Sequence, residues 1–488
     1  MNNKSNFLPG VSPKFYGRSK RSQLEALRLE RKSVFGKSIT DLGVLFSEIL
    51  PIDWLRDNTS DSRERLFPQV ITFWAWASQL LEQNESCEKS LTLIQQWYSA
   101  NGLEPPVFDT SGYCKARRRM PSEFLNTIAN KIEDYADARV EDHHLWYGHR
   151  LKAIDGTSVK LMDTPENQAE YTQPSSQKKG CGFPKMGWLG VLDLARGTIC
   201  DYVTCSERQH DAKSFYQVSD CFDPGDVVIG DRAFCSYGMI CKLEGRRVDT
   251  VLRLHQKREG KLDWEKGEKL GSDSRLVTWR KPPTPGKSGF TEEEWAELPD
   301  ELSIRLVRIR SKDREGKKQT MYVATTLREA ELYPTEEIAL LYEERWKIEV
   351  KFRDIKTTMG FEKLRVKSPE MAHLTMQMIQ IVYNLVKTRQ AEAIVGEAIQ
   401  IDEVSFKGTL DVLNESRSRY HHLADRPRLF AQENETLDER IRERFIVIRP
   451  FRQEPRAIKT RPKPYQYLTK PRGEFKEIQH KSHYRKAA

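Results

Sequence analysis

The feature that most constrains the fold is an ordered set of strand and helix signals in the middle of the chain. Short runs rich in β-branched residues predict strands, and a longer mixed run between them predicts a helix. Strands are expected at Leu151–Val159, Gly187–Leu194, Thr198–Thr204 and Asp226–Gly230, with a hairpin turn at Ala195-Arg196-Gly197 and a helix over His210–Phe222. The order strand, hairpin, helix, strand predicts an α/β fold.

Helical patterns flank this segment, and a typical domain holds very roughly 100–200 residues, so the 488-residue chain should contain two or three domains. A dense cationic run at Tyr113–Arg119 suits DNA contact in the first helical part, for which an ordinary helical bundle is the alternative. We predict a basic N-terminal arm (1–35), a helical DNA-binding domain (36–145), an α/β core (146–390) with a β-rich insertion at about 258–328, and a helical, basic C-terminal region (391–488).

The net charge of +9 is concentrated at the C-terminal end. The tail, residues 449–488, holds twelve Lys and Arg against three acids, so it carries +9 while the preceding residues sum to zero. Prolines recur through it, together with Tyr465, Tyr467, Phe475 and Tyr484. Because cations displace counterions from a polyanion and aromatic rings stack on bases, we expect the tail to bind nucleic acid. A solvated tail is the alternative.

Composition excludes a membrane protein and favours a cytoplasmic one. Hydrophobic residues make up 38% and charged residues 31%, and the mean hydropathy is −0.68. No window reaches the roughly 18 continuous apolar residues that a membrane span needs. The N-terminal residues lack the apolar segment and cleavage site that are typical of secreted proteins.

Cysteine and histidine spacing favours neither disulfides nor a zinc site. The eight cysteines include no C-x-x-C pair, which predicts reduced thiols in a chain of this size. The ten histidines show no H-x-x-x-H spacing, and the adjacent His143 and His144 are expected to point away from each other on a helix or a strand.

Two acids attract attention because of where the predicted strands put them. Asp155 interrupts the strand in Ile154-Asp155-Gly156-Thr157, and Asp231 directly follows the strand that ends at Gly230. Two strand-borne carboxylates in one sheet can converge on a cation. For either acid alone, a structural role in a turn or a helix cap is the favoured alternative.

A third acid lies in a helical pattern that begins near Thr335. Four polar residues there stand at offsets 0, 3, 7 and 14: Tyr342, Arg345, Glu349 and Lys356. At about 100° per residue they fall within roughly 60° of one another on a single helix. One face would then present a carboxylate between two cations and a phenol. A solvated charged face is the alternative.

Together these residues resemble the signature of the bacterial insertion-sequence DDE transposases of the IS-four family. The pattern Y-x-x-R-x-x-x-E-x-x-x-x-x-x-K is matched at all four positions: Tyr342, Arg345, Glu349 and Lys356. The surroundings of Asp155 and Asp231 are similar to those of the other two acids of that family. The resemblance covers roughly residues 113–386.

The resemblance implies an RNase H-like catalytic core with a β-strand insertion, and cut-and-paste movement of a DNA element bounded by inverted repeats. It implies that Asp155, Asp231 and Glu349 are catalytic and hold two Mg²⁺ ions, for which Mn²⁺ can substitute. Carboxylates are the hard oxygen donors that such ions prefer, and two ions about 3.5–4 Å apart support displacement at phosphorus. The implied partner is double-stranded DNA, bound by a dimer on paired ends in the bacterial cytoplasm and at the nucleoid.

The resemblance also assigns DNA contacts. Tyr342, Arg345 and Lys356 would bind phosphates near the cleaved end, and Trp279 or Trp295 in the insertion would stack on a flipped base. Three alternatives remain. A haloacid-dehalogenase-type phosphatase is disfavoured because its motif needs an acid where Ala153 stands. A retired transposase kept as a DNA-binding protein would be expected to have lost an acid, and a structure-selective nuclease on the same core would cut DNA without joining it.

Overall fold

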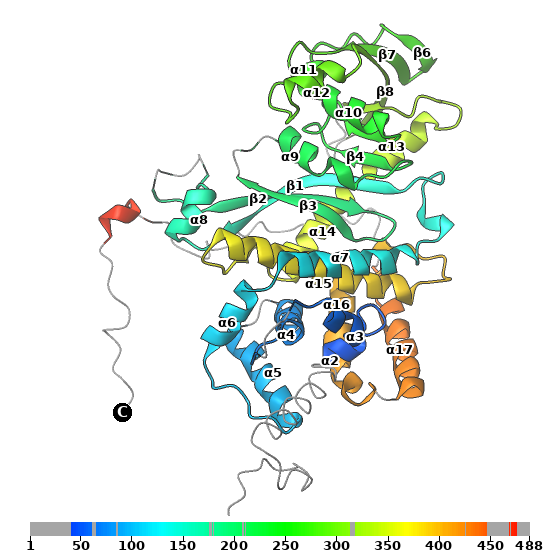
Figure 1. Cartoon of the computed structure of the whole chain (residues 1–488). Helices are drawn as coiled ribbons and strands as arrows, with labels where there is room; N and C mark the ends of the chain where they lie inside the picture. The colour runs from blue at the N-terminus through cyan, green and yellow to red at the C-terminus, as the bar shows by residue number, and fades with distance from the viewer. Residues whose placement is uncertain are drawn as a thin grey trace, which may run out of the picture.

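The computed structural model describes residues 41–60, 65–83, 86–174, 178, 180–206, 209, 211–312, 318–424, 426–446, 468 and 470–475. The predicted basic arm and nearly all of the predicted tail lie outside the described residues. Within them, the chain is a mixed α/β protein in which one large sheet runs from a β-rich end to a helical end (Figure 1).

The described strands form a single sheet in the order β3-β2-β1-β4-β5-β9-β8-β7-β6, with β10 paired to β1. Their bounds are β1 (Leu151–Leu161), β2 (Lys185–Asp193), β3 (Ile199–Ser206), β4 (Val227–Gly230), β5 (Asp249–Arg253), β6 (Glu268–Gly271), β7 (Ser274–Arg280), β8 (Glu301–Lys312), β9 (Lys318–Thr325) and β10 (Lys363–Leu364). The predicted strands and the β2–β3 hairpin are confirmed. Gly197 adopts φ +68° in that turn, a conformation that glycine tolerates without strain.

The register of the central strands determines which residues share an edge. β1 pairs with β2 in antiparallel and with β4 in parallel orientation, and β4 pairs in parallel with β5. Ile154 lies opposite Gly230 in the β1–β4 pair. The residues that follow these two, Asp155 and Asp231, therefore emerge at the same end of neighbouring parallel strands.

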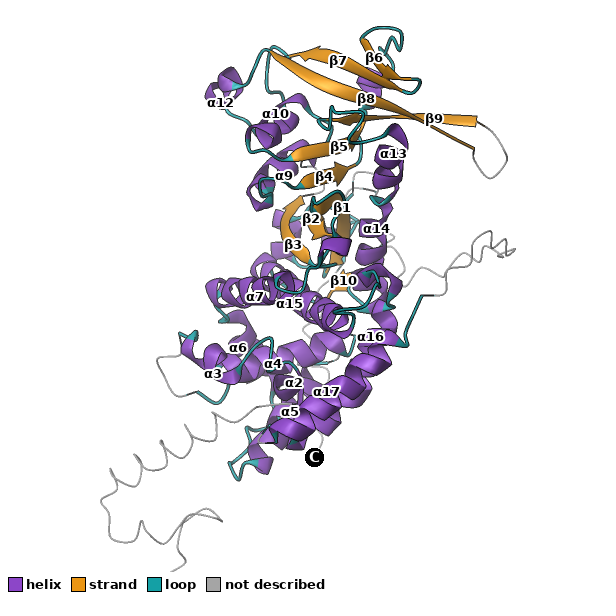
Figure 2. Ribbon diagram, turned by 90° about the vertical axis from the view of Figure 1, so that its right-hand side faces the viewer, coloured by secondary structure: helices purple, strands orange, loops and turns teal. Residues whose placement is uncertain are grey.

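The predicted β-rich insertion extends this sheet. Between β5 and α13 (Thr335–Glu343) the chain forms α11 (Gln256–Glu259), β6, β7, α12 (Glu292–Glu297), β8 and β9. β9 pairs in antiparallel orientation with β5, so the added strands continue the central sheet at the β-rich end (Figure 2). α9 (Asp211–Gln217), η3 (Ser219–Cys221) and α10 (Tyr237–Gly245) complete the predicted α/β order, and a second core cluster packs around α9, α10 and the insertion.

The helical end combines the first and last parts of the described chain. The upstream helices are α2 (Asp41–Leu45), α3 (Ile52–Asp57), α4 (Gln69–Leu81), α5 (Cys87–Ala100), α6 (Thr110–Arg118), α7 (Ser122–Asp137) and the short η2 (Asp142–His144). The downstream helices are α15 (Pro369–Ala393), η5 (Ile401–Glu403), α16 (Phe406–Ser416), η6 (Arg417–His422) and α17 (Pro427–Arg442). α8 (Pro165–Glu170) follows β1, and η7 (Arg472–Glu474) lies in the tail.

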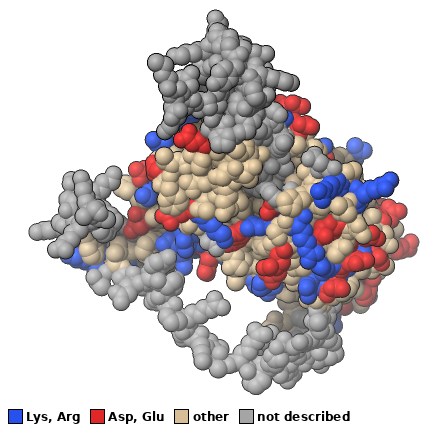
Figure 3. Space-filling view, turned by 90° about the horizontal axis from the view of Figure 1, so that it is seen from below, with Lys and Arg blue, Asp and Glu red and all other residues tan. Residues whose placement is uncertain are grey.

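One hydrophobic core joins the sheet to both sets of helices. It runs from Leu42 through β1 and α15 to Ile441, with α7 and α15 side by side beneath the sheet (Figure 1). The predicted boundary at residue 145 therefore does not separate two cores. On the face at the helical end, basic and acidic side chains are interspersed among the described residues (Figure 3). Within the described part of the chain, no helix has the length and apolar character needed to span a membrane.

A glycine on β2 lets a helix approach the sheet where Asp155 lies. Gly190 is the cross-strand partner of Asp155. A Cβ added at Gly190 would lie 3.2 Å from the ring of Phe352, which α14 (Trp346–Arg353) packs onto the sheet. Phe352 also contacts Trp188, with ring centroids 4.9 Å apart. The absent side chain at position 190 therefore sets how closely α14 approaches β1.

Gly190→Val should lower the free energy of unfolding by roughly 1–3 kcal/mol, because the added methyl groups overlap the Phe352 ring in a packed interface. Thermal and urea unfolding of the full chain measure this change. The matched control is Gly245→Ala, since a Cβ there meets nothing within 4 Å. Equal stability of both variants would contradict the close packing of α14.

Candidate active site

Asp155 and Asp231 lie near each other where β4 ends beside the middle of β1, as their positions in the sequence predicted. Asp155 is 21% exposed, and the Gly156 amide donates to its Oδ1 at 2.8 Å. Burial raises the pKa of Asp155 to about 6, and the charges of Glu349 and Asp231 act in the same direction. The Gly156 amide and Arg345 oppose them. The three acids are therefore close enough to repel one another.

The stretch that carries the third acid is not the single helix that we predicted. α13 ends at Glu343, α14 begins at Trp346, and a π-helical turn, η4 (Asp354–Thr358), follows. The Arg345 amide donates to the Tyr342 carbonyl three residues back, whereas the Met359 amide donates five residues back to Asp354. Tight and wide turns break the 3.6-residue period, so the arithmetic that put Tyr342 and Lys356 on one helical face was wrong.

The residues of this stretch nevertheless gather around the acids because Arg345 bridges them. Its Nη1 lies 3.7 Å from Asp155 Oδ2, and its Nη2 donates to Glu349 Oε1 at 3.0 Å. The guanidinium carbon is 6.0 Å from the centroid of the Tyr342 ring. Burial raises the pKa of Tyr342 to about 12, and the charge of Asp231 contributes. The phenol is therefore protonated at neutral pH and able to donate a hydrogen bond.

The fourth residue, Lys356, approaches from the π-helical turn. Its Nζ donates to Thr157 Oγ1 at 3.1 Å, two residues beyond Asp155 on β1. Lys160 and Lys185 form a cross-strand pair near it. Burial lowers the pKa of Lys356, and these two lysines lower it further, while Glu362 acts in the opposite direction. The edge beside the acids thus carries a cluster of cations.

Arg253 lies at this site but was not predicted, and the exposed Trp346 directly follows Arg345 in the sequence. Arg253 is the last residue of β5, and its buried Nε has no hydrogen-bond partner among the described residues. Its charge lowers the pKa of Tyr342, which places it near the phenol. Trp346 is 58% exposed at the start of α14. The position of Arg253 follows only from the pairing of β4 with β5, which no local pattern reveals.

The two tryptophans assigned to base stacking lie elsewhere, in the insertion. Trp279 is 8% exposed, and Arg258 covers its ring with the guanidinium carbon 4.0 Å from the centroid. Trp295 is 6% exposed, and its indole N–H donates to the Pro282 carbonyl at 3.0 Å. Either ring would have to leave the core to stack on a base, so this assignment stays a prediction.

The donor set of Asp155, Asp231 and Glu349 fits a hard divalent cation. All three offer carboxylate oxygens. Their three possible negative charges exceed the one positive charge of Arg345, which bridges Asp155 and Glu349. Burial, and after it the charges of Glu349 and Asp231, raise the pKa of Asp155, and a bound metal ion would offset both effects. These residues are therefore the ones that would hold divalent ions.

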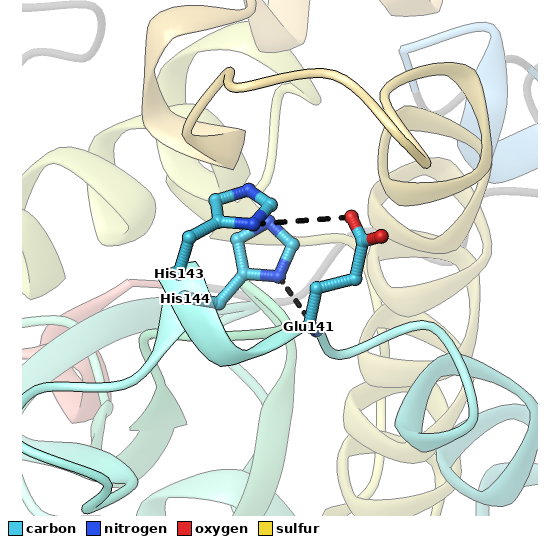
Figure 4. A group of neighbouring side chains, drawn as sticks. All are labelled: Glu141, His143 and His144. Atoms are coloured by element: carbon cyan, nitrogen blue, oxygen red, sulfur yellow. Dashed lines mark hydrogen bonds and ion pairs between the residues drawn. The ribbon is translucent and has the colours of Figure 1, made fainter.

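A different group has its ligand atoms within 4.8 Å of one another: Glu141, His143 and His144 (Figure 4). The expectation that the two histidines point apart was wrong, because the short 3₁₀ turn η2 brings their ring centroids to 4.0 Å. However, the Glu141 amide donates to His144 Nδ1 at 3.0 Å, so a neutral His144 ring carries its proton on Nε2. That nitrogen is then a donor, which argues against a preformed metal site.

In sequence, the chain is similar to known transposases. The family described as the transposase DDE domain matches residues 146–385, a range that contains all of the candidate residues. The transposase InsG for insertion sequence element IS4 of Escherichia coli K12 is 25% identical over 354 residues, covering 72% of this chain and 76% of that protein. The piggyBac transposase, solved as a synaptic complex with hairpin DNA, matches with a TM-score of 0.39 and 12% identity over 84% of each chain.

Mn²⁺ should raise the thermal midpoint of the full chain, since a ligand at a hundredfold excess over its dissociation constant adds about 2.7 kcal/mol of stability. Asp155→Asn should lose most of that rise, and His143→Ala should keep it. Thermal unfolding across a Mn²⁺ titration checks both variants. A rise lost in His143→Ala but kept in Asp155→Asn would move the metal to the group around Glu141.

Proposed function

We propose that this chain, which belongs to the DDE transposase family, cleaves the ends of an insertion sequence and joins them to target DNA by phosphoryl transfer. The observation that carries the proposal is the meeting of Asp155, Asp231 and Glu349 beside Arg345 at one end of the sheet. Gathering like charges in this way costs stability, and it suits a site that binds cations and phosphate.

We also propose that the core is RNase H-like. The strand order β3-β2-β1-β4-β5, with β2 antiparallel to β1, supports this assignment. So does the insertion between β5 and α13, which lies between the second and third acids in the sequence. In this arrangement the acids come from the middle of β1, the end of β4 and the first turn of α14.

The three acids would hold the divalent ions. Two Mg²⁺ ions, or Mn²⁺ in their place, would activate the attacking hydroxyl and stabilise the leaving oxygen of an in-line displacement. Asp155 and Asp231 would fix the ions relative to the sheet. Glu349, which is 55% exposed and projects from α14, would complete the ligand set. No side chain needs to act as a nucleophile in this reaction.

The cations and the phenol would hold the DNA backbone. Arg345 offers a planar pair of donors for a phosphate, and Lys356 a compact charge near Thr157. The protonated phenol of Tyr342 adds a donor. We add Arg253 to this set, because its buried Nε has no partner among the described residues. These groups would position the scissile phosphate and stabilise its developing charge.

Double-stranded DNA is the proposed partner, with the terminal inverted repeats as its specific sites. The relative from Escherichia coli is by name the transposase of an insertion sequence element. Assembly as a dimer on paired ends and a basic tail that binds DNA remain predictions, and nearly all of the tail falls outside the described residues.

Asp155→Asn, Asp231→Asn and Glu349→Gln should each abolish Mg²⁺-dependent cleavage while DNA ends still bind, because each change removes a metal ligand but no phosphate contact. A strand-transfer assay on paired ends, run beside a binding assay, measures both steps. The matched control is Glu343→Gln, an exposed acid at the end of α13. A Glu349→Gln protein that cuts at the normal rate would remove the third ligand from the proposal. Cutting without joining by the unaltered chain would instead indicate a nuclease.

Arg253→Ala and Lys356→Ala should weaken DNA binding and make it less dependent on salt. Each lost phosphate contact should reduce the slope of log affinity against log salt by about 0.9. The control is Arg353→Ala, which removes an exposed cation from the end of α14. Binding isotherms at several salt concentrations give the slopes. Equal slopes for all three variants and the original chain would show that neither residue contacts phosphate.

A further inference from the structure

Two free thiols lie side by side where α5 meets α6, far in sequence from the acids. The sulfur atoms of Cys87 and Cys114 are 3.9 Å apart, although 27 positions separate the residues. Both side chains are partly exposed. Rotation of the two side chains that brings the sulfur atoms about 2 Å closer would reach the roughly 2.05 Å length of a disulfide bond.

A fixed cation accompanies the pair. Arg117 Nη2 lies 3.4 Å from Cys87 Sγ and 4.0 Å from Cys114 Sγ. The guanidinium is held by Gln79 Oε1, which accepts from Nη1 at 3.2 Å, and by the rings of Trp76 and Tyr113 at 5.2 and 5.1 Å. A cation held in place beside a thiol favours the thiolate, which is the reactive form of cysteine.

The helix that begins at this point acts in the same direction. Cys87 is the first residue of the 14-residue α5, and the Ser86 hydroxyl caps that helix by accepting from the Lys89 amide. The partial positive charge at this amino end lies beside both sulfurs, so it favours one negative charge on the pair while the other sulfur keeps its proton.

We propose that Cys87 and Cys114 form a redox-active dithiol, which a peroxide oxidises to a disulfide that links the start of α5 to the middle of α6. The modification is separate from the transposition chemistry, and its outcome does not depend on the proposed roles of the acids.

The reaction balances with hydrogen peroxide as the oxidant. The thiolate sulfur attacks one peroxide oxygen, the O–O bond breaks, and the departing oxygen leaves as water after taking up a proton, so that a sulfenic acid remains. The second thiol attacks the sulfenic sulfur, the S–S bond forms, the S–O bond breaks, and a second water leaves. Two thiols thereby lose two electrons and two protons, and one peroxide becomes two waters.

Proton sharing supports the assignment. The hydrogen bond between the two thiols lowers the pKa of Cys114 to about 6, with help from Arg117 and against the effect of burial. The same hydrogen bond raises the pKa of Cys87, and burial adds to it. Burial instead raises the pKa of both Cys235 and Cys241 to about 11. The pair therefore loses a proton more readily than those two cysteines.

A second neighbouring pair provides an internal comparison. Its member Cys200 donates its S–H to the Val191 carbonyl at 3.3 Å. The other member is Cys221. A hydrogen bond with Cys200, together with burial, raises the pKa of Cys221. The nearby cation, Lys152, already pairs with Asp226 at 2.7 Å. Because Lys152 is paired with Asp226, Cys200 and Cys221 lack a cation that interacts mainly with their sulfurs. Peroxide should therefore oxidise Cys87 and Cys114 first.

The location suggests what a disulfide would affect. The exposed side chains of Lys115, Arg118 and Arg119 form the cationic end of α6. Tying α6 to the start of α5 would restrict that end relative to α4 and α5. Oxidation would also leave Arg117 without its thiolate partner.

Mass spectrometry of the full chain tests the proposal directly. The reduced protein is treated with hydrogen peroxide, digested without reductant, and compared with an untreated sample. We expect a linked peptide containing Cys87 and Cys114 as the main product, and its loss on treatment with a thiol reductant. The proposal is overturned if the Cys200–Cys221 peptide forms first, if the linkage joins two chains, or if all cysteines oxidise at similar rates.

Variants at Arg117 test the role of the cation. Alkylation by iodoacetamide at pH 7 should be several-fold faster at Cys114 than at Cys241 in the same chain. Arg117→Gln should remove most of that difference, and Arg117→Lys should keep it, with thermal unfolding checking that both variants fold. In Cys87→Ser, where no disulfide can form, peroxide should leave a sulfenic acid on Cys114 that dimedone traps. A Cys114 that reacts no faster than Cys241 in the unaltered chain would refute the activated dithiol.

Discussion

The parallel pairing of β1 with β4 is the constraint on which the site depends. Because Ile154 lies opposite Gly230, the next residues on the two strands are both acids. A slip of one residue would turn Asp155 to the other face of the sheet. Gly230 contributes to this register, since a Cβ there would lie 3.0 Å from both Ile154 Cγ2 and Leu252 Cδ2. Tight packing of the residues just before the two acids thus fixes where the acids lie on the sheet.

The third acid reaches the same edge by a different route. Phe352 anchors α14 where β2 has no side chain at Gly190, and Glu349 lies one turn earlier on that helix. The breaks at Glu344–Arg345 and at η4 let residues before and after α14 turn toward the sheet. Interruptions of this kind are common at functional sites, where local regularity is given up for the placement of a side chain.

Sequence patterns predicted the parts of the fold that local rules govern. The strands of the core, the β2–β3 hairpin and the helical character of the first part of the chain follow from periodicity and turn residues. The acids were proposed because two end or interrupt strands and one lies in a recognisable spacing. The break in the signature helix and the place of Arg253 were missed, because backbone hydrogen bonding and strand pairing decide them. The contacts of His143 with His144 and of Cys87 with Cys114 were missed for the same reason, since tertiary placement determines both.

Arg345 ties these features together because it can serve two partners in turn. Its contacts to Asp155 and Glu349 are partly exposed, and such ion pairs typically contribute only about 0.2–1 kcal/mol each. Charge-assisted hydrogen bonds to a phosphate are roughly twice as strong as neutral ones and use the same planar donors. Releasing the acids would therefore cost little relative to binding DNA, and it would free carboxylate oxygens for cations at the same moment. In the proposed transposase site, one side chain would thus couple the arrival of the phosphate to the release of the acids for metal binding.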